Sequence, residues 1–116
     1  MKDYRVTLDV QIPAEEYRDM MAVELAEALE EDERALGPIA SGDESVPALG
    51  AVLGVWAENA AEALERAQAV MMEAMGKIGV RGPVRVIYAE VVPYDWADAM
   101  DEKRWPVQHA ATMESR

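Results

Sequence analysis

The stretch from Tyr4 to Ile12 alternates strictly between apolar and polar side chains, and this alternation constrains the fold more than any other feature of the sequence. One side of an extended chain would carry Tyr4, Val6, Leu8, Val10 and Ile12, and the other side would carry Arg5, Thr7, Asp9 and Gln11. A period of two predicts a half-buried β-strand. Pro13 then ends the strand and suits the first position of a helix, because proline has no N–H to donate.

Residues from about Ala14 to Asp32 are predicted to form the first helix. Apolar side chains recur there at intervals of three and four residues, at Tyr17, Met21, Leu25, Ala28 and Leu29. Glu15 and Glu16 suit the positive end of the helix dipole, whereas residues 30–33 place four carboxylates at its negative end. That run is interpreted either as a frayed, solvated helix end or as an acidic surface that meets a basic partner.

The middle of the chain predicts two strands. The first is Leu36–Ser41, which Gly37 and Pro38 weaken and which turns at residues 42–44. The second, Ala48–Glu58, is apolar on both faces, as is typical of a strand in the middle of a sheet or beneath a second layer. One of its faces carries Gly50, Gly54 and Trp56. That grouping indicates a bulge, close packing, or room for another molecule to approach.

A second helix is predicted to begin at a capping box, in which Asn59 accepts a hydrogen bond and Glu62 reaches back. Its apolar face carries Ala60, Ala63, Leu64, Ala67, Met71, Met75 and Ile78. Either Gly76 or Gly79 ends it. The last predicted strand runs from Val84 to Val92, with Val84, Val86 and Tyr88 on one face and Ile87, Ala89 and Val91 on the other.

The order strand, helix, strand, strand, helix, strand predicts an α+β fold, the ferredoxin-like βαββαβ arrangement, with two helices on one face of a small antiparallel sheet. The stretch Val55–Ala67 (VWAENAAEALERA) is similar to the strand–cap–helix passage of many small ferredoxin-like proteins. The Ala, Val and Glu content also resembles that of uncharacterised proteins of actinobacteria and their phages. This resemblance covers residues 4–93 at the level of the fold and implies no catalytic residue. We therefore expect a ferredoxin-like domain over residues 1–93 and a C-terminal extension over residues 94–116.

The C-terminal extension mixes large apolar side chains with acids. The large apolar residues are Tyr94, Trp96, Met100 and Trp105, and the acids are Asp95, Asp98, Asp101 and Glu102. We expect residues 94–105 to be ordered and to bury at least one tryptophan, because exposed aromatic rings forgo a favourable burial free energy. We expect residues after about Gln108 to be mobile.

Composition excludes several classes of protein. The 116 residues include no cysteine, which excludes disulfide scaffolds and thiolate sites, and the single histidine, His109, excludes multi-histidine metal sites. A formal charge of −12 disfavours binding to nucleic-acid phosphates. The N-terminal stretch lacks the apolar core of a signal peptide, and no apolar run approaches the roughly 20 residues that span a bilayer. We expect a cytoplasmic protein with no cofactor and no bound metal.

Candidate catalytic groups are sparse. Asp9 and Glu90 lie within predicted strands and could point to one sheet face as an acid pair, or each could be solvated. Oxygen ligands for a cation occur at Asp98, Asp101 and Glu102. They lack the spacing and the glycine of an EF-hand loop, which favours a charged helix face instead. Residues 76–82 hold glycines and two cations but follow a helix, which indicates a turn rather than a phosphate loop.

Charge and methionine are unevenly distributed along the chain. Residues 15–44 hold 11 acids and 2 bases, whereas Lys77, Arg81 and Arg85 form the only basic cluster. The adjacent pairs Met20–Met21 and Met71–Met72 indicate either core filler or an adaptable partner surface.

These patterns support three hypotheses for the function. The first is a non-enzymatic protein-interaction module that forms a homodimer through the uncovered sheet face, unless the C-terminal extension folds over that face. The second is an acidic inhibitor whose carboxylates mimic nucleic-acid phosphates for a basic protein. The third is a small-ligand binder or enzyme that uses Trp56, Arg85 or Tyr88 on the sheet face. The predicted partner-binding residues are Glu24, Glu27, Glu30, Glu31, Asp32, Glu33, Trp56, Tyr88, Trp96 and Trp105.

Overall fold

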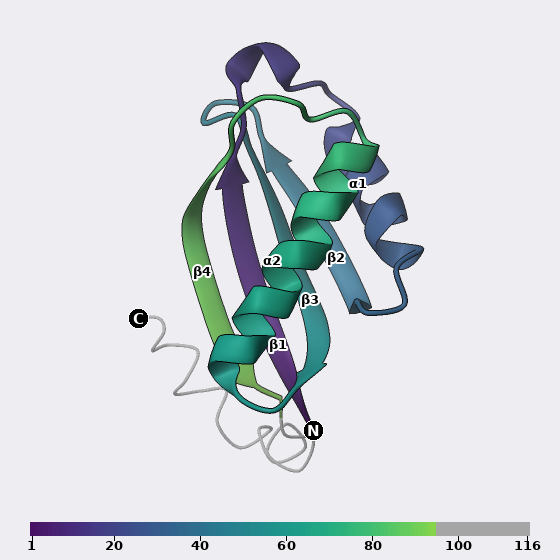
Figure 1. The fold of residues 1–116 in the computed structure, drawn as a ribbon. Helices are drawn as coiled ribbons and strands as arrows, with labels where there is room; N and C mark the ends of the chain where they lie inside the picture. The colour runs from purple at the N-terminus through teal and green to yellow at the C-terminus, as the bar shows by residue number, and fades with distance from the viewer. Residues whose placement is uncertain (95–116) are drawn as a thin grey trace, which may run out of the picture.

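Four antiparallel strands form a sheet, and two helices lie on one face of it, in the computed structural model, which describes residues 1–94 (Figure 1). The elements in chain order are β1 (Lys2–Gln11), the 3-10 turn η1 (Ala14–Glu16), α1 (Met21–Glu30), β2 (Leu36–Asp43), β3 (Ala48–Ala57), α2 (Ala60–Lys77) and β4 (Arg85–Pro93). The strand order across the sheet is β2-β3-β1-β4. The fold is therefore α+β, as the sequence predicts.

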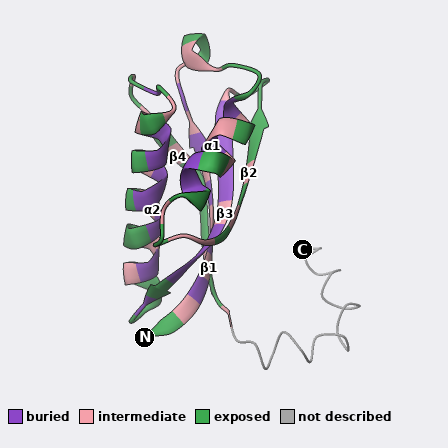
Figure 2. Ribbon diagram, turned by 90° about the vertical axis from the view of Figure 1, so that its right-hand side faces the viewer, coloured by how far each residue is buried: buried purple, intermediate pink, exposed green. Residues whose placement is uncertain are grey.

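β1 is a central strand, and its alternation is confirmed. The side chains of Tyr4, Val6, Leu8 and Val10 are each 5% exposed or less, whereas the intervening residues are partly exposed. We call the face that carries the four buried side chains the closed face, because α1 and α2 pack on it. Figure 2 shows the buried sides of both helices turned toward the sheet. Helices and strands share one hydrophobic core.

The first helix is shorter than predicted. Residues 14–16 form only the turn η1, and α1 does not begin until Met21. Contacts with the α2–β4 connection compete with a continuous helix at this point. The Glu16 carboxylate accepts hydrogen bonds from the backbone N–H groups of Arg81 and Gly82, with N···O distances of 3.0 Å for each. Arg18 donates to the Ile78 carbonyl oxygen at 2.6 Å. Glu16 therefore binds the backbone of the α2–β4 connection instead of stabilising the N-terminus of a helix.

The weak second strand forms, and it is two residues longer than predicted. Its pairing with β3 shifts by one residue between Leu36 and Ile39. Gly37 takes a positive φ of 54° there, in the left-handed region that glycine adopts readily. The glycine–proline pair therefore makes a bulge in an edge strand rather than abolishing the strand.

The capping predictions for α2 are confirmed at both ends. The Glu62 N–H donates to Asn59 Oδ1 at 2.9 Å, and Glu62 Oε1 accepts from the Glu58 N–H at 2.6 Å. At the other end Gly79 has a φ of 101°, and the Val80 N–H donates to the Met75 carbonyl at 3.0 Å. This bonding is that of a Schellman motif, which closes the helix at Gly79 rather than Gly76.

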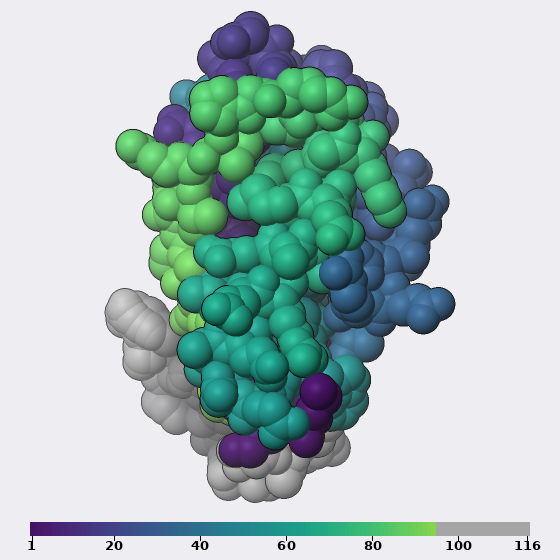
Figure 3. Space-filling model, in the orientation of Figure 1, coloured from purple at the N-terminus to yellow at the C-terminus, as the bar shows by residue number. Residues whose placement is uncertain are grey.

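The predicted faces of the last strand are wrong, because β4 contains a bulge. Its register against β1 shifts between Val86 and Tyr88, which leaves Ile87 as the extra residue. Tyr88 therefore lies on the face opposite to Val86, and Val86 shares its face with Ala89 and Val91. β4 is thinly covered even on the helix side, where Ala89 is exposed. Figure 3, viewed from that side, shows β4 beside α2 rather than beneath it.

One methionine of each adjacent pair lies in the core. Met21 and Met71 are fully buried, whereas Met20 is exposed and Met72 packs against the core from its margin. Within residues 1–94, no helix is long and apolar enough to cross a membrane. The predictions for Trp96, Trp105, His109 and the Asp98–Glu102 acids lie outside the described residues, as do the order expected up to residue 105 and the mobile end.

Candidate functional site

The second face of the sheet carries no helix in the part of the chain that the structure describes, and we call it the open face. β1 contributes Asp3, Arg5, Thr7, Asp9 and Gln11 to it. The strand pairings place three rows of residues across it: Leu36, Gly54, Arg5 and Val92; Ile39, Val52, Thr7 and Glu90; Ser41, Gly50, Asp9 and Tyr88. The open face is thus a polar central strand between flanks that are partly apolar.

Large apolar side chains on these flanks reach into solvent. Ile39 is 66% exposed, and Ile87, Tyr88 and Val92 are between 41% and 48% exposed. Of these only Tyr88 is singled out by the sequence. Ile39 follows a glycine and a proline, which hides its strand, and no sequence signal marks the bulge that turns Ile87 outward. Val92 lies on the face of Tyr88 by simple alternation.

The two glycines of β3 are covered by neighbouring side chains. An added Cβ at Gly50 would lie 2.5 Å from Asp9 Oδ1 and 2.9 Å from Ser41 Oγ. At Gly54 the Cβ would lie 3.1 Å from Leu36 Cβ. The sequence leaves three explanations for these glycines, which are a bulge, close packing and room for another molecule. The contacts support close packing. They let the polar side chains of β1 lie flat on the sheet.

Arg5 is held against the open face from two sides. Its Nη1 donates to the Leu36 carbonyl oxygen at 3.4 Å, and its guanidinium carbon lies 5.0 Å from the centre of the Tyr94 ring. The second distance is that of a cation–π contact. The Tyr94 N–H also donates to the Asp3 carbonyl at 2.8 Å, which extends the β1–β4 pairing by one residue. The Tyr94 ring therefore lies beside Arg5 at the open face.

Asp9 and Glu90 lie on the same face of the sheet, as the sequence allows. Neither carboxyl has a resolved interaction with the other, and they belong to adjacent rows. A hollow of about 360 Å³ adjoins Asp9, between Asp43 and Ile87. Within residues 1–94 no cluster of three or more His, Asp or Glu side chains could hold a metal ion.

The residues proposed for a small ligand are not brought together. Trp56 lines a pocket of about 380 Å³ with Arg34 and Arg66, beyond the end of β2. Arg66 there donates to the Trp56 carbonyl oxygen at 2.7 Å. Tyr88 and Arg85 lie on β4, which is separated from β3 by β1. No single ligand site on the open face therefore combines all three.

The predicted acidic surface divides into paired and unpaired carboxylates. Glu24 pairs with Arg18 at 2.9 Å, and Asp32 pairs with Arg34 at 2.7 Å. Arg34 also contacts Glu73 of α2 at 2.6 Å, which ties the end of α1 to α2. The hydrogen bond from Arg34 lowers the pKa of Asp32 to about 2 from its ordinary 3.8. Asp32 is thus structural rather than available to a partner.

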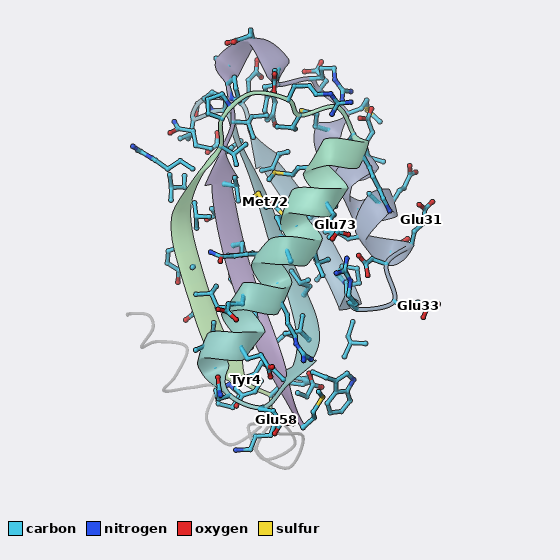
Figure 4. The ribbon with its side chains drawn as sticks, viewed as in Figure 1. Tyr4, Glu31, Glu33, Glu58, Met72 and Glu73 are labelled. Atoms are coloured by element: carbon cyan, nitrogen blue, oxygen red, sulfur yellow. The ribbon has the colours of Figure 1, made fainter. Side chains whose placement is uncertain are left out.

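The remaining acids of this group face solvent. Glu27, Glu30, Glu31 and Glu33 are exposed, and none has an ion pair within residues 1–94. Figure 4 shows Glu31 and Glu33 pointing outward at the end of α1. They lie on the helix layer, away from the open face, so the two predicted binding surfaces are separate.

Comparison of the sequence with protein-family models gave no match, and comparison with curated proteins found no similar sequence. The resemblance to small ferredoxin-like proteins of actinobacteria and phages therefore stays a prediction. Function has to be inferred from the geometry of the described residues.

Proposed function

We propose that this chain is a small, acidic, non-enzymatic interaction module that forms a homodimer through the open face. The observation that carries the proposal is the exposure of Ile39, Ile87, Tyr88 and Val92 on the open face, which no helix of residues 1–94 covers. Exposed apolar side chains gathered on one face are typical of an interface. A two-fold dimer would bury the same flanks on both subunits at once.

The proposal includes a ferredoxin-like βαββαβ topology. The element order and the antiparallel strand order β2-β3-β1-β4 support it. In such a two-layer fold the helices cover one face only, so the second face needs another covering if it is apolar. A second copy supplies that covering without any further protein.

The test compares two valine-to-aspartate variants by sedimentation velocity. Val92 lies on the open face at 45% exposure, and Val23 lies on α1 at 49% exposure. Both substitutions add one negative charge to an equally exposed site, so neither should unfold the chain. We expect the unmodified protein and Val23→Asp to be dimeric and Val92→Asp to be monomeric, because an interface tolerates a buried unpaired charge poorly.

A strictly monomeric protein at high concentration would overturn the homodimer. Residues 95–116, which follow Tyr94 in the sequence, would then be the candidate covering. A chain truncated after Tyr94 distinguishes the two coverings. Truncation would lower the melting temperature of the monomer if the extension covers the face, and would leave a dimer unchanged if it does not.

A second candidate function is mimicry of nucleic-acid phosphates by the exposed carboxylates. Glu27, Glu30, Glu31 and Glu33 support it, because they have no ion pair within the described chain. A variant with these four changed to glutamine should lose the ability to displace DNA from a basic protein at low salt. The matched control neutralises four other exposed acids away from the open face, at Glu15, Asp19, Glu44 and Glu65. Equal displacement by both variants would contradict mimicry.

A further inference from the structure

The open face carries its charges in an order that specifies how a second copy docks. We infer that the two copies pack with their β1 strands antiparallel and the two-fold axis over Thr7, so that Arg5 of one copy faces the partner's Asp9. The inference rests on the proposed homodimer and adds its geometry. Its evidence is the register of the sheet and the side chains that cover the two glycines of β3.

The open side of β1 is antisymmetric in charge about Thr7. Arg5 and Asp9 stand two positions before and after it, and Asp3 and Gln11 stand four positions before and after it. Reversing the strand about Thr7 places the cation of one copy against the anion of the other, and the outer acid against a neutral amide. Both Arg5–Asp9 contacts of the dimer are then attractive.

Packing with parallel β1 strands brings like charges together. If the two-fold axis ran along β1, Arg5 would lie opposite the partner's Arg5, and Asp9 would lie opposite the partner's Asp9. An axis between β1 and β3 would face Arg5 with the partner's Gly54, its row neighbour in the register. In that arrangement the Arg5 and Asp9 rows stay apart, so neither residue would face an opposite charge of the partner. Like-charge contacts across an interface are unfavourable, which selects the antiparallel arrangement.

The apolar flanks also match in the antiparallel arrangement. Val92 shares a row with Arg5, and Tyr88 shares a row with Asp9, so each Val92 faces the partner's Tyr88. The rows also bring Gly54 opposite the partner's Gly50, so no bulky β3 side chain stands between the two copies in these rows. Glu90, in the Thr7 row, would face its own copy, but it lies on the edge strand, where solvent screens the repulsion.

Cross-linking tests the orientation directly, because the chain has no native cysteine. The variants Asp3→Cys and Gln11→Cys are prepared separately, mixed under reducing conditions to exchange subunits, and treated with a short bis-maleimide. In the inferred dimer residue 3 faces residue 11 across packed sheets about 10 Å apart, whereas two copies of residue 3 are about 27 Å apart. We expect a cross-linked dimer from the mixture and none from either variant alone.

Each other outcome is decisive. Cross-linking of each variant alone would show parallel strands and overturn the inference while leaving the homodimer. If samples that sediment as dimers gave no cross-linked product, the inferred orientation would likewise be overturned and the homodimer would stand. Samples that sediment as monomers before treatment would overturn the proposed function itself.

Charge reversal provides a second, independent measurement. Arg5→Glu and Asp9→Lys should each raise the dimer Kd at least about tenfold, because each places two like-charge pairs at the interface. The double variant restores opposite charges and should return the Kd to within about threefold of the original. Additive weakening in the double variant would overturn the Arg5–Asp9 contact.

Discussion

The closed and open faces of the sheet use the same strands differently. On the closed face the side chains of Leu8, Leu49, Leu53 and Val10 are fully buried beneath two helices. On the open face Gly50 of β3 is covered by Asp9 and Ser41 and Gly54 by Leu36, while isoleucine, tyrosine and valine side chains remain in solvent. The comparison shows that apolar composition alone does not locate a core. A strand residue is buried only where a second layer is available to cover it.

The largest expected effect is the difference in unfolding free energy lost by substitutions at two adjacent residues of β1, Leu8 and Thr7. Leu8→Ala should lower the free energy of unfolding by about 2–5 kcal/mol, because it leaves a cavity under the helices. Thr7→Ala, on the open face, should lower it by about 1 kcal/mol or less. Urea unfolding at low protein concentration measures both. Equal losses would mean that the open face is also packed in the monomer.

Two glycine-to-alanine substitutions, one in β3 and one in α2, test whether neighbouring side chains pack closely on the β3 glycine. Gly54→Ala should lower the free energy of unfolding by about 1 kcal/mol or more, since its Cβ would lie 3.2 Å from the Leu36 backbone oxygen. Gly76→Ala should raise it by about 0.5–1 kcal/mol, because Gly76 is helical and nothing lies within 4 Å of its Cβ position. Thermal unfolding distinguishes the opposite signs. A stabilising Gly54→Ala would refute close packing there.

Arg34 pairs with Asp32 and with Glu73 and so joins the end of α1 to α2. These ion pairs should make the free energy of unfolding depend on pH. The pKa of Asp32 is lowered to about 2 from 3.8, so its contribution is present above pH 3.8 and is lost as the pH falls through 2. Asp32→Asn should therefore cost about 1 kcal/mol at pH 6, after screening by solvent, and almost nothing near pH 2. The measurement is the difference in unfolding free energy between variant and parent. A pH-independent difference would contradict it.

The smallest expected effect lies at the edge of the open face. Ile39→Ser should change the free energy of unfolding of the monomer by no more than about 0.5 kcal/mol, because Ile39 is 66% exposed. The same unfolding measurement at low concentration applies. A loss above about 1.5 kcal/mol would show that Ile39 is covered within one chain, which would point to residues 95–116 rather than to a second copy.

The candidate site is only partly predictable. Tyr88 and the uncovered sheet face follow from the apolar pattern of the last strand, and the polar residues of β1 follow from its alternation. Val92 alternates with Tyr88 and so shares its face, whereas Ile87 could not be assigned, because a single extra residue in β4 reverses every face assignment on one side of it. Asp32 is predicted as a binding residue, yet Arg34 converts it to a structural one. The pairing depends on a loop conformation that no periodic pattern encodes.

What the sequence by itself determined is the set of elements and the caps that begin and end them. The alternation of β1, the Asn59–Glu62 box and the Gly79 end are local signals, and each acts within a few residues along the chain. What only the tertiary structure decided is where the first helix begins and which glycine is covered. Glu16 binds the backbone of Arg81 and Gly82, and Arg5 reaches Leu36 on another strand. Such contacts join residues more than 30 positions apart, so their free energy exists only once the sheet has brought them together.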